Sequence, residues 1–195
     1  LADINTAGLE ESAALVHQLG GEARIQPTDI SQRAAVDALA AAALQVTGRL
    51  DVWVNAAGII VSSPIVSTTE TDLDRVLAVN LKGAYFGCAA AGRIMQNTRS
   101  GAIVNVSSAG GESPVPNLSV YSLTKAALNM LTRAAAKELG PFGIRVNAVA
   151  PGWVDTPMGT HAFRDASGAI DPVKRAEGLR QRAQASPLGL TGTPR

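Results

Sequence analysis

Short apolar runs alternate along this chain with longer stretches that carry apolar residues at helical spacing. Strands buried on both faces of a parallel sheet have such runs, and the intervals between them are long enough for crossover helices. Right-handed crossovers then place helices on both faces of the sheet. We therefore expect a doubly wound α/β fold with a parallel sheet. The expected strands lie at residues 1–5, 23–27, 50–54, 101–106 and 144–149.

Four helices are expected between these strands. Ser31 is placed to cap the second helix and Gly48 to end it. Thr69-Glu-Thr-Asp72 has the spacing of a capping box, with Asp where Glu or Gln is usual, and opens a long helix. Residues 157–187 are rich in Gly, Arg and Ala with weak periodicity, so we expect a mobile loop with short helices there. The expected helices lie at about residues 9–16, 34–47, 69–95 and 121–139.

Charge and composition argue against several classes of protein. The 17 basic and 16 acidic residues are scattered and the net charge is +1, so we expect no nucleic-acid partner. The single cysteine, Cys88, cannot form an internal disulfide, which favours the reducing cytoplasm. No apolar run reaches the roughly 18 residues of a membrane span. We therefore expect a cytoplasmic protein of one domain over residues 1–195, without a membrane partner or a metal site.

A tyrosine and a lysine four residues apart, Tyr121 and Lys125, are the strongest candidates for chemistry. On a helix these two positions share a face. An ammonium group beside a phenol stabilises the phenolate, which suits the pair to proton transfer near neutral pH. Ser107 and Ser108 end a predicted strand, and ligands of α/β sheets bind beyond the carboxyl ends of strands. A serine hydroxyl there can hold a substrate oxygen in line with the phenol.

An acidic residue, Asp3, ends the first predicted strand. A dinucleotide-binding fold places an acid there to accept hydrogen bonds from the adenosine ribose, and its charge would repel a 2'-phosphate. The alternative is an aspartate that caps the next helix. We expect NAD as the cofactor in preference to NADP.

Two further motifs contain polar or small residues at positions where such residues are unusual. Asn80 falls within an otherwise apolar helical stretch, where an amide is costly unless its hydrogen bonds are met; a surface-facing asparagine is the alternative. Asn55-Ala56-Ala57-Gly58 follows a predicted strand, and its small residues let backbone approach a cofactor or a neighbouring strand closely. A plain strand-to-loop turn would also account for this motif.

The order of these motifs resembles the short-chain dehydrogenase/reductase family. The resemblance runs from Leu1 to about Thr193 and includes Pro151-Gly152 after the last predicted strand. It implies a Rossmann-like fold and a catalytic set of Asn80, Ser108, Tyr121 and Lys125. Ser108 is chosen over Ser107 because the family places its serine thirteen residues before the tyrosine. Asn80 is then expected to hold a water that joins Lys125 to solvent.

The resemblance also implies a cofactor site, a reaction and an assembly. Segment 157–187 would cover a small-molecule alcohol or ketone, interconverted by hydride transfer; acyl thioesters, sugars, polyols and steroids all remain open as substrates. The family often forms homotetramers, and a tetramer or dimer is expected. A noncatalytic nucleotide-binding or interaction protein on the same scaffold is the alternative. The implied cofactor-binding residues are Asp3, Asp29, Ile30, Asn55, Ala56, Ala57, Gly58, Tyr121, Lys125, Pro151, Gly152, Val154 and Thr156.

The chain departs from the family pattern at both ends. It contains no glycine-rich turn in the position where a dinucleotide site needs one for the pyrophosphate. Residues 186–195 resemble the segment that in this family leads into another helix and a last strand, and neither element follows in this sequence. We therefore expect this sequence to be a partial chain.

Overall fold

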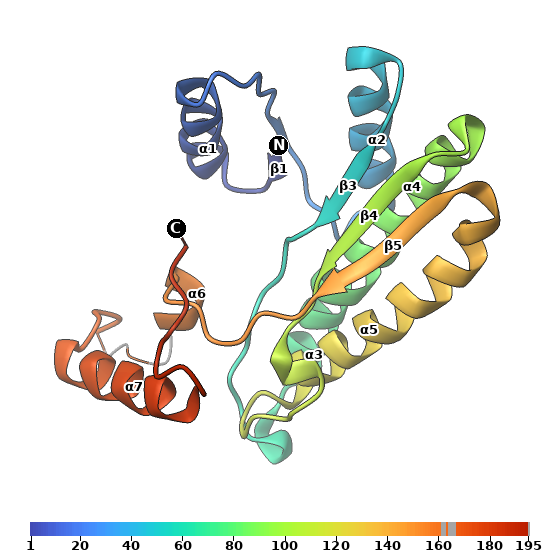
Figure 1. Ribbon diagram of the computed structural model, residues 1–195. Coiled ribbons are helices and arrows are strands. Elements are labelled where there is room, and N and C mark those ends of the chain that lie inside the picture. The colour runs from blue at the N-terminus through green and yellow to red at the C-terminus, as the bar shows by residue number, and fades with distance from the viewer. Residues whose placement is uncertain (161–162, 164–166, 195) are drawn as a thin grey trace. The chain divides into compact units, whose positions relative to one another are not determined.

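A computed structural model describes residues 1–160, 163 and 167–194 (Figure 1). The chain forms two compact units, Leu1–Ala150 and Pro151–Arg195, and each is described by itself. The expectation of one domain over residues 1–195 stays a prediction.

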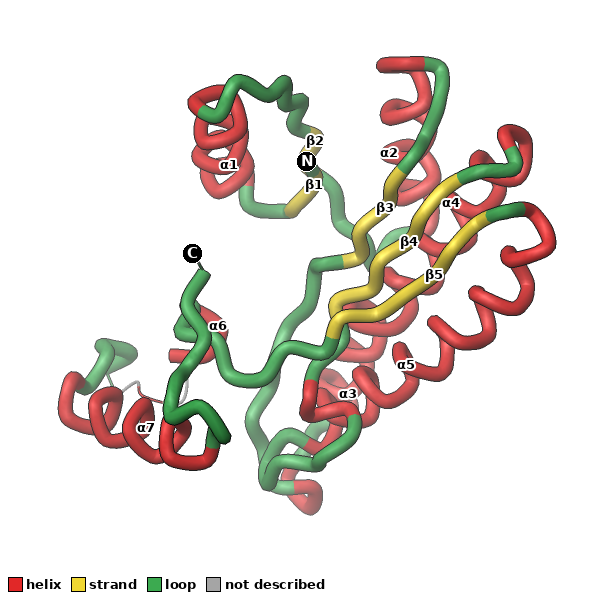
Figure 2. The backbone as a smooth tube through the Cα atoms, viewed as in Figure 1, coloured by secondary structure: helices red, strands yellow, loops and turns green. Residues whose placement is uncertain are grey.

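All strands of the first unit run parallel (Figure 2). The strands β1 (Ala2–Asp3) and β2 (Gln26–Pro27) pair with each other, so β2 is shorter than the predicted run of residues 23–27. The strands β3 (Val52–Asn55), β4 (Gly101–Val106) and β5 (Ile144–Val149) form a second sheet in that order. The α/β fold class with parallel strands is confirmed.

Helices alternate with these strands as predicted. The predicted glycine stop of the helix α2 (Arg33–Thr47) is confirmed, because Gly48 adopts a left-handed conformation with φ of 74°. The predicted cap is wrong: Gln32 occupies the N-cap position, and the Ser31 hydroxyl donates to Asp29 Oδ1 at 2.7 Å instead. The helices of the first unit are α1 (Thr6–Gln18), α2 (Arg33–Thr47), α3 (Glu70–Leu77), α4 (Ala84–Thr98) and α5 (Ser119–Leu139), with 3-10 turns at Ile65–Ser67, Ala109–Gly111 and Gly140–Phe142.

The long helix predicted for residues 69–95 changes its winding part-way. Thr69 caps α3 as predicted, because its hydroxyl oxygen accepts a hydrogen bond from the Asp72 amide at 3.1 Å. A π-helical segment, Ala78–Gly83, then separates α3 from α4. Such wide turns occur often at functional sites. Asn80 lies within this one and is only 1% exposed.

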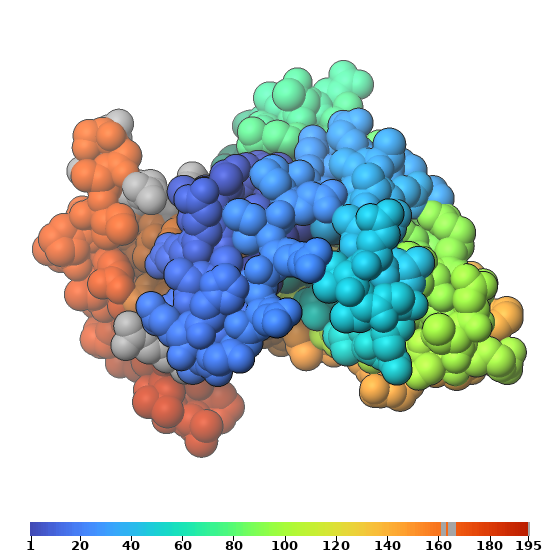
Figure 3. Space-filling view, turned by 90° about the horizontal axis from the view of Figure 1, so that it is seen from above, coloured from blue at the N-terminus to red at the C-terminus, as the bar shows by residue number. Residues whose placement is uncertain are grey.

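The main core of the first unit lies between the three-stranded sheet and the helices α4 and α5 (Figure 1). Ile103 of β4 and Met95 of α4 are fully buried there. Val52 and Val54 of β3 alternate with the inward residues and are 56% and 55% exposed. Within the described part of this unit, one face of the three-stranded sheet is therefore open, whereas helices on both faces were expected. Helix α1, dark blue in Figure 3, buries only Leu9.

The second unit contains α6 (Pro157–Thr160) and α7 (Pro172–Ala185). Asp171 caps α7, because its Oδ1 accepts hydrogen bonds from the amides of Val173 and Lys174. The helix has 14 residues although the apolar periodicity of this segment is weak. The guanidinium carbon of Arg182 lies 3.7 Å from the centroid of the Trp153 ring and 4.9 Å from that of Phe163. These aromatic side chains pack within the unit. Among the residues described, no helix is long and apolar enough to cross a membrane.

Candidate active site

The two serines after β4 have different roles. Ser107 is 3% exposed, and its hydroxyl donates to the Lys125 carbonyl at 3.2 Å. Ser108 is half-buried, and its Oγ accepts a hydrogen bond from the Gly110 amide at 3.0 Å. Ser107 therefore joins β4 to α5, whereas the hydroxyl of Ser108 lies on the loop side. The catalytic role of Ser108 stays a prediction.

The Lys125 side chain is buried beside the Tyr121 ring. Lys125 is 4% exposed, and its Nζ lies 5.6 Å from the centroid of the Tyr121 ring. The ammonium group donates to the Val106 carbonyl at the end of β4, at 2.8 Å. Desolvation lowers the pKa of Lys125 from its ordinary value. An ammonium has three N–H donors, so this contact leaves two for other acceptors.

The surroundings of Gly110 show that the side chains of Ser108 and Tyr121 lie close to the same point. A Cβ atom on Gly110 would lie 3.4 Å from Ser108 Oγ and 3.7 Å from Tyr121 Cε1. The hydroxyl and the ring edge therefore border the same small space. The loop after β4 and the first turn of α5 thus bring these two candidate catalytic side chains together.

The hydrogen bonds of Asn80 are all made by groups of the first unit. Its Oδ1 accepts from the Ile59 amide at 2.8 Å, and its Nδ2 donates to the Ile59 carbonyl at 2.9 Å and to Thr124 Oγ1 at 3.2 Å. The alternative of a surface-facing asparagine is therefore wrong. A Cβ atom on Gly58 would lie 3.4 Å from Asn80 Oδ1 and 3.6 Å from Lys125 Nζ, so both atoms border one space.

Asn55 points into the core. Its Oδ1 accepts from Trp53 Nε1 at 2.7 Å, and its Nδ2 donates to Asn105 Oδ1 at 2.8 Å. Asn105 Nδ2 donates in turn to Thr132 Oγ1 at 2.9 Å. These bonds link β3 to β4 and β4 to α5, so the Asn55 side chain stabilises the sheet. Ala56 and Ala57, which follow it at the carboxyl end of β3, are exposed.

The residues expected on the adenosine side follow β1 and β2. Asp3 is exposed, and its Oδ1 accepts from the Asn5 amide at 2.9 Å. The residue that caps α1 is Asn5, so the alternative of Asp3 as the helix cap is wrong. Asp29 Oδ1 accepts a hydrogen bond from the Ser31 amide at 2.9 Å. Ile30 packs against a small apolar cluster formed by Val36 and Ala40 of α2 and Ala90 of α4. Their roles toward a cofactor stay predictions.

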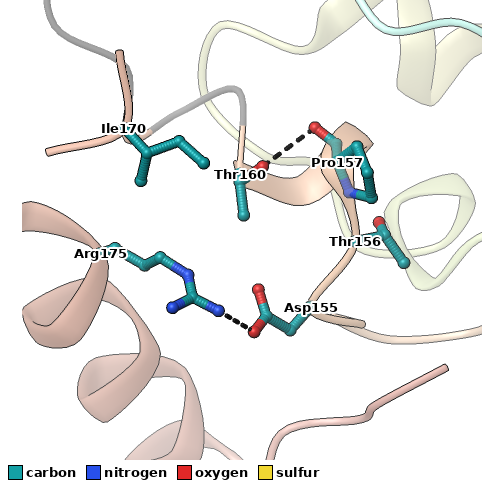
Figure 4. A pocket seen from close by; sticks show the side chains of 6 residues that line it. All are labelled: Asp155, Thr156, Pro157, Thr160, Ile170 and Arg175. Atoms are coloured by element: carbon teal, nitrogen blue, oxygen red, sulfur yellow. Dashed lines mark hydrogen bonds and ion pairs between the residues drawn. The ribbon is translucent and has the colours of Figure 1, made fainter. Parts of the chain in front are cut away.

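The remaining predicted cofactor residues belong to the second unit. Val154 forms a parallel bridge with Gly192, and Thr156 Oγ1 accepts from the Gly159 amide at 3.3 Å. Thr156 also borders a pocket of about 350 Å³ (Figure 4). Asp155 and Arg175 form an ion pair at this pocket. The lining residues are Asp155, Thr156, Pro157, Thr160, Ile170 and Arg175.

The sequence analysis did not identify two residues that contribute to the candidate site, Thr124 and Gly111. Thr124 directly precedes Lys125 and is fully buried, and its hydroxyl contacts Asn80. At Gly111 an added Cβ atom would lie 2.8 Å from the Lys125 carbonyl carbon of α5, so a side chain there has no room. The only sequence signal for Thr124 is a polar residue at a core-facing position of α5. Across the described ranges, no three His, Cys, Asp or Glu side chains gather as a metal site would require.

The comparisons with known proteins decide the family. A sequence profile described as "Enoyl-(Acyl carrier protein) reductase" matches residues 1–191. The chain is also 37% identical over 188 residues to 3beta-hydroxysteroid dehydrogenase 1 of Eggerthella lenta, covering 96% of this chain and 68% of that protein. The chain belongs to the short-chain dehydrogenase/reductase family. It is therefore identified as an oxidoreductase acting on CH–OH groups.

Solved structures of this family agree with the fold. NAD+-bound xylitol dehydrogenase superimposes with a TM-score of 0.89 at 31% identity, over 99% of this chain and 76% of that one. Gluconate 5-dehydrogenase of Burkholderia cenocepacia J2315, in complex with NADP and tartrate, has a TM-score of 0.84 at 27% identity, over 99% and 72% of the two chains. The solved structures similar to this chain thus include both an NAD complex and an NADP complex.

Proposed function

We propose that the protein interconverts a secondary alcohol and a ketone by hydride transfer, with Ser108, Tyr121, Lys125 and Asn80 as its catalytic set. The observation that carries this proposal is the buried Lys125 ammonium, held by the Val106 carbonyl 5.6 Å from the Tyr121 ring centroid. A buried charge needs compensation, and a phenolate beside it supplies that compensation. Ser108 Oγ borders the same space as the ring edge of Tyr121.

Each residue has a distinct part in the proposed reaction. In the oxidative direction the Tyr121 phenolate accepts the proton of the substrate hydroxyl, while Ser108 Oγ holds the substrate oxygen in place. Lys125 stabilises the phenolate. Asn80 is proposed to hold a water that connects Lys125 to solvent. Asn80 Oδ1 and Lys125 Nζ both lie close to the position of a Cβ atom on Gly58. Reduction follows the same path in reverse.

The chain carries groups that suit the nicotinamide end of a dinucleotide. Lys125 has two N–H donors beyond its bond to Val106, which suit the hydroxyls of a ribose. Pro151, Gly152, Val154 and Thr156 are the residues proposed to hold the nicotinamide, and Asp3 and Asp29 the residues proposed for the adenosine side. When bound, the nicotinamide supplies the hydride acceptor or donor, which no side chain can replace.

The test is a substrate screen with the full-length protein. A panel of steroid alcohols, polyols, sugars and 3-hydroxyacyl thioesters is incubated with NAD or NADP, and formation of reduced nicotinamide is followed by absorbance. We expect turnover with at least one class. Cofactor binding without turnover of any class would instead support the noncatalytic alternative.

We further propose that NAD is preferred over NADP because of Asp3. The exposed carboxylate has one oxygen engaged by the Asn5 amide, and a 2'-phosphate beside it would meet a like charge. Asp3→Asn in the full-length protein is expected to raise the affinity for NADPH relative to NADH by about tenfold to a hundredfold, as removal of a like-charge contact predicts. Binding is measured by titration of the cofactor fluorescence.

The matched control for this change is Glu10→Gln, which removes an equal charge from the exposed surface of α1. It is expected to leave the ratio of the two affinities unchanged. Tighter binding of NADPH than of NADH by the unmodified protein would refute the proposed role of Asp3.

Gly58→Ala tests the proposed proton path. The new methyl would lie at ordinary contact distances, 3.4 Å from Asn80 Oδ1 and 3.6 Å from Lys125 Nζ, so folding should survive. Because it occupies the space that these atoms border, kcat is expected to fall by about tenfold to a hundredfold, within the range of acid–base contributions. Steady-state kinetics in normal and heavy water measure the effect.

Gly140→Ala is the matched control, because a Cβ atom there meets nothing within 4 Å. It is expected to keep wild-type kinetics and melting temperature. Wild-type kcat in Gly58→Ala would show that no proton path uses this space.

We also propose a cytoplasmic homo-oligomer, a dimer or tetramer, built through the long helices. Tyr85 of α4 and Leu123 and Met130 of α5 are each more than half exposed in the single chain, which supports an apolar contact between copies. Light scattering of the full-length protein measures the number of copies.

A further inference from the structure

The pocket of the second unit contains a carboxylate whose hydrogen bonding is incomplete. One oxygen of Asp155, Oδ2, pairs with the Arg175 guanidinium. The other oxygen, Oδ1, is buried and has no hydrogen-bond partner among the residues described. In Figure 4 it points away from Arg175, toward Thr160. A buried acceptor without a donor is costly, so this oxygen calls for a donor from a group that enters the pocket.

The same pocket offers hydrogen-bond donors from Arg175. A guanidinium has five N–H groups, and the bond from one terminal nitrogen to Asp155 does not use them all. The Arg175 side chain is 41% exposed, whereas that of Asp155 is 21% exposed, so Arg175 lies on the more open side of the pair. N–H groups therefore remain for the oxygen atoms of a ligand. Thr160 donates its hydroxyl proton to the Pro157 carbonyl at 3.1 Å and can only accept toward the pocket.

The size and the charge of the pocket restrict the kind of molecule that it fits. A volume of about 350 Å³ lies in the range of small-molecule sites. Because Arg175 already neutralises Asp155, an anionic ligand would have to separate the pair and leave the carboxylate without its partner. An apolar ring system would leave both polar groups without ligand contacts. A neutral molecule with adjacent hydroxyls can donate to Asp155 and accept from Arg175 at once.

We propose that Asp155 and Arg175 are specificity-determining residues that bind adjacent hydroxyl groups, and that the substrate is therefore a polyol or a sugar. This inference rests on the proposed function for the statement that the bound molecule is the substrate. The binding of a hydroxylated molecule to the pocket does not depend on that statement.

Arg175 is not needed to hold the helix α7 in place, because other contacts do so. The Arg182 guanidinium stacks on the Trp153 ring, with 3.7 Å from its carbon to the ring centroid. Gly178 lies so close to Phe163 that an added Cβ atom would be 2.3 Å from the ring. Substitution of Arg175 should therefore change the pocket and leave the packing of the helix intact.

The first experiment compares Arg175→Gln with Arg180→Gln in the full-length protein. Both changes remove an arginine of α7 from an ion pair, since Arg180 pairs with Glu177 at 2.8 Å, but Arg180 does not line the pocket. Binding of xylitol and of cyclohexanol, which has a single hydroxyl, is measured by saturation-transfer NMR titration. Arg175→Gln is expected to weaken xylitol binding by about tenfold to a hundredfold, as loss of hydrogen bonds to a charged group predicts, and to leave cyclohexanol binding unchanged. Arg180→Gln is expected to leave both unchanged.

Asp155→Asn provides a readout that a structural role of the ion pair would not produce. The change keeps the shape of the side chain and removes the charge that neutralises Arg175. Xylonate, a carboxylate with the same five-carbon skeleton as xylitol, is expected to gain affinity relative to xylitol by about tenfold or more, because the unpaired guanidinium attracts an anion. A loss of structure would weaken both ligands. This variant also tests the proposal if Arg175→Gln does not fold.

The outcomes separate the pocket from the proposed function. Absence of xylitol binding to the unmodified protein, or equal weakening of it by Arg175→Gln and Arg180→Gln, would overturn the role of the pair. An unchanged ratio of xylonate to xylitol affinity in Asp155→Asn would do the same. The expected binding pattern in a protein that oxidises no alcohol would uphold the pocket and refute the proposed function. Turnover of steroid alcohols without xylitol binding would uphold the proposed function and overturn this inference.

Discussion

Tyr121→Phe is expected to lower kcat by about a thousandfold while leaving NADH affinity within a few-fold of the unmodified protein, as loss of a general acid–base group predicts. The change removes only the phenolic oxygen that exchanges the proton with substrate. The ring that contacts the Lys125 ammonium is kept, so packing at the site should be preserved. Steady-state kinetics give kcat, and a fluorescence titration gives the cofactor affinity.

The only other tyrosine of the chain provides the control. Tyr85 of α4 is 56% exposed, and Tyr85→Phe is expected to leave kcat unchanged. If Tyr121→Phe turned over substrate at the unmodified rate, Tyr121 would not be the acid–base group and the proposed mechanism would fail.

Gly111→Ala is expected to cost stability and activity together. A Cβ atom on Gly111 would lie 2.8 Å from the Lys125 carbonyl carbon and 3.0 Å from the Ala126 nitrogen. These are backbone atoms of α5, which cannot move aside as a side chain can. Relief requires the loop that carries Ser108 to shift away from α5. Overpacking of this kind costs about 1–3 kcal/mol, and a displacement of about 1 Å at a reacting group lowers the rate by roughly a hundredfold.

Gly110→Ala is the neighbouring control for stability. Its Cβ would meet Ser108 Oγ at 3.4 Å and Tyr121 Cε1 at 3.7 Å, which are ordinary contacts, so the free energy of unfolding should change little. Urea denaturation of both variants measures the difference. Equal stability of the two would mean that the loop after β4 does not pack on α5 as described.

Local patterns predicted the parallel strands and the catalytic candidates. An apolar run such as residues 101–106 is typical of a buried strand, and β4 has these bounds in the structure. The spacing of Tyr121 and Lys125 predicted their shared helix face, since helical geometry alone sets which positions are neighbours. The cap at Ser31 was wrong because its hydroxyl bonds the preceding aspartate instead. Short helices were predicted in residues 157–187, but the helix at residues 172–185 is longer than expected because few of its residues form an apolar stripe.

The sequence by itself determined the fold class and the candidates for the reacting groups, because periodicity and residue spacing are local properties. Only the tertiary structure decided how these groups are held. The buried Lys125 ammonium is held by the Val106 carbonyl at the end of β4, and the Asn80 carboxamide is held by Ile59 and Thr124. Gly111 allows the loop after β4 to reach α5. These contacts join residues that are distant in sequence, and their geometry arises only when the packed core brings the strands and helices together.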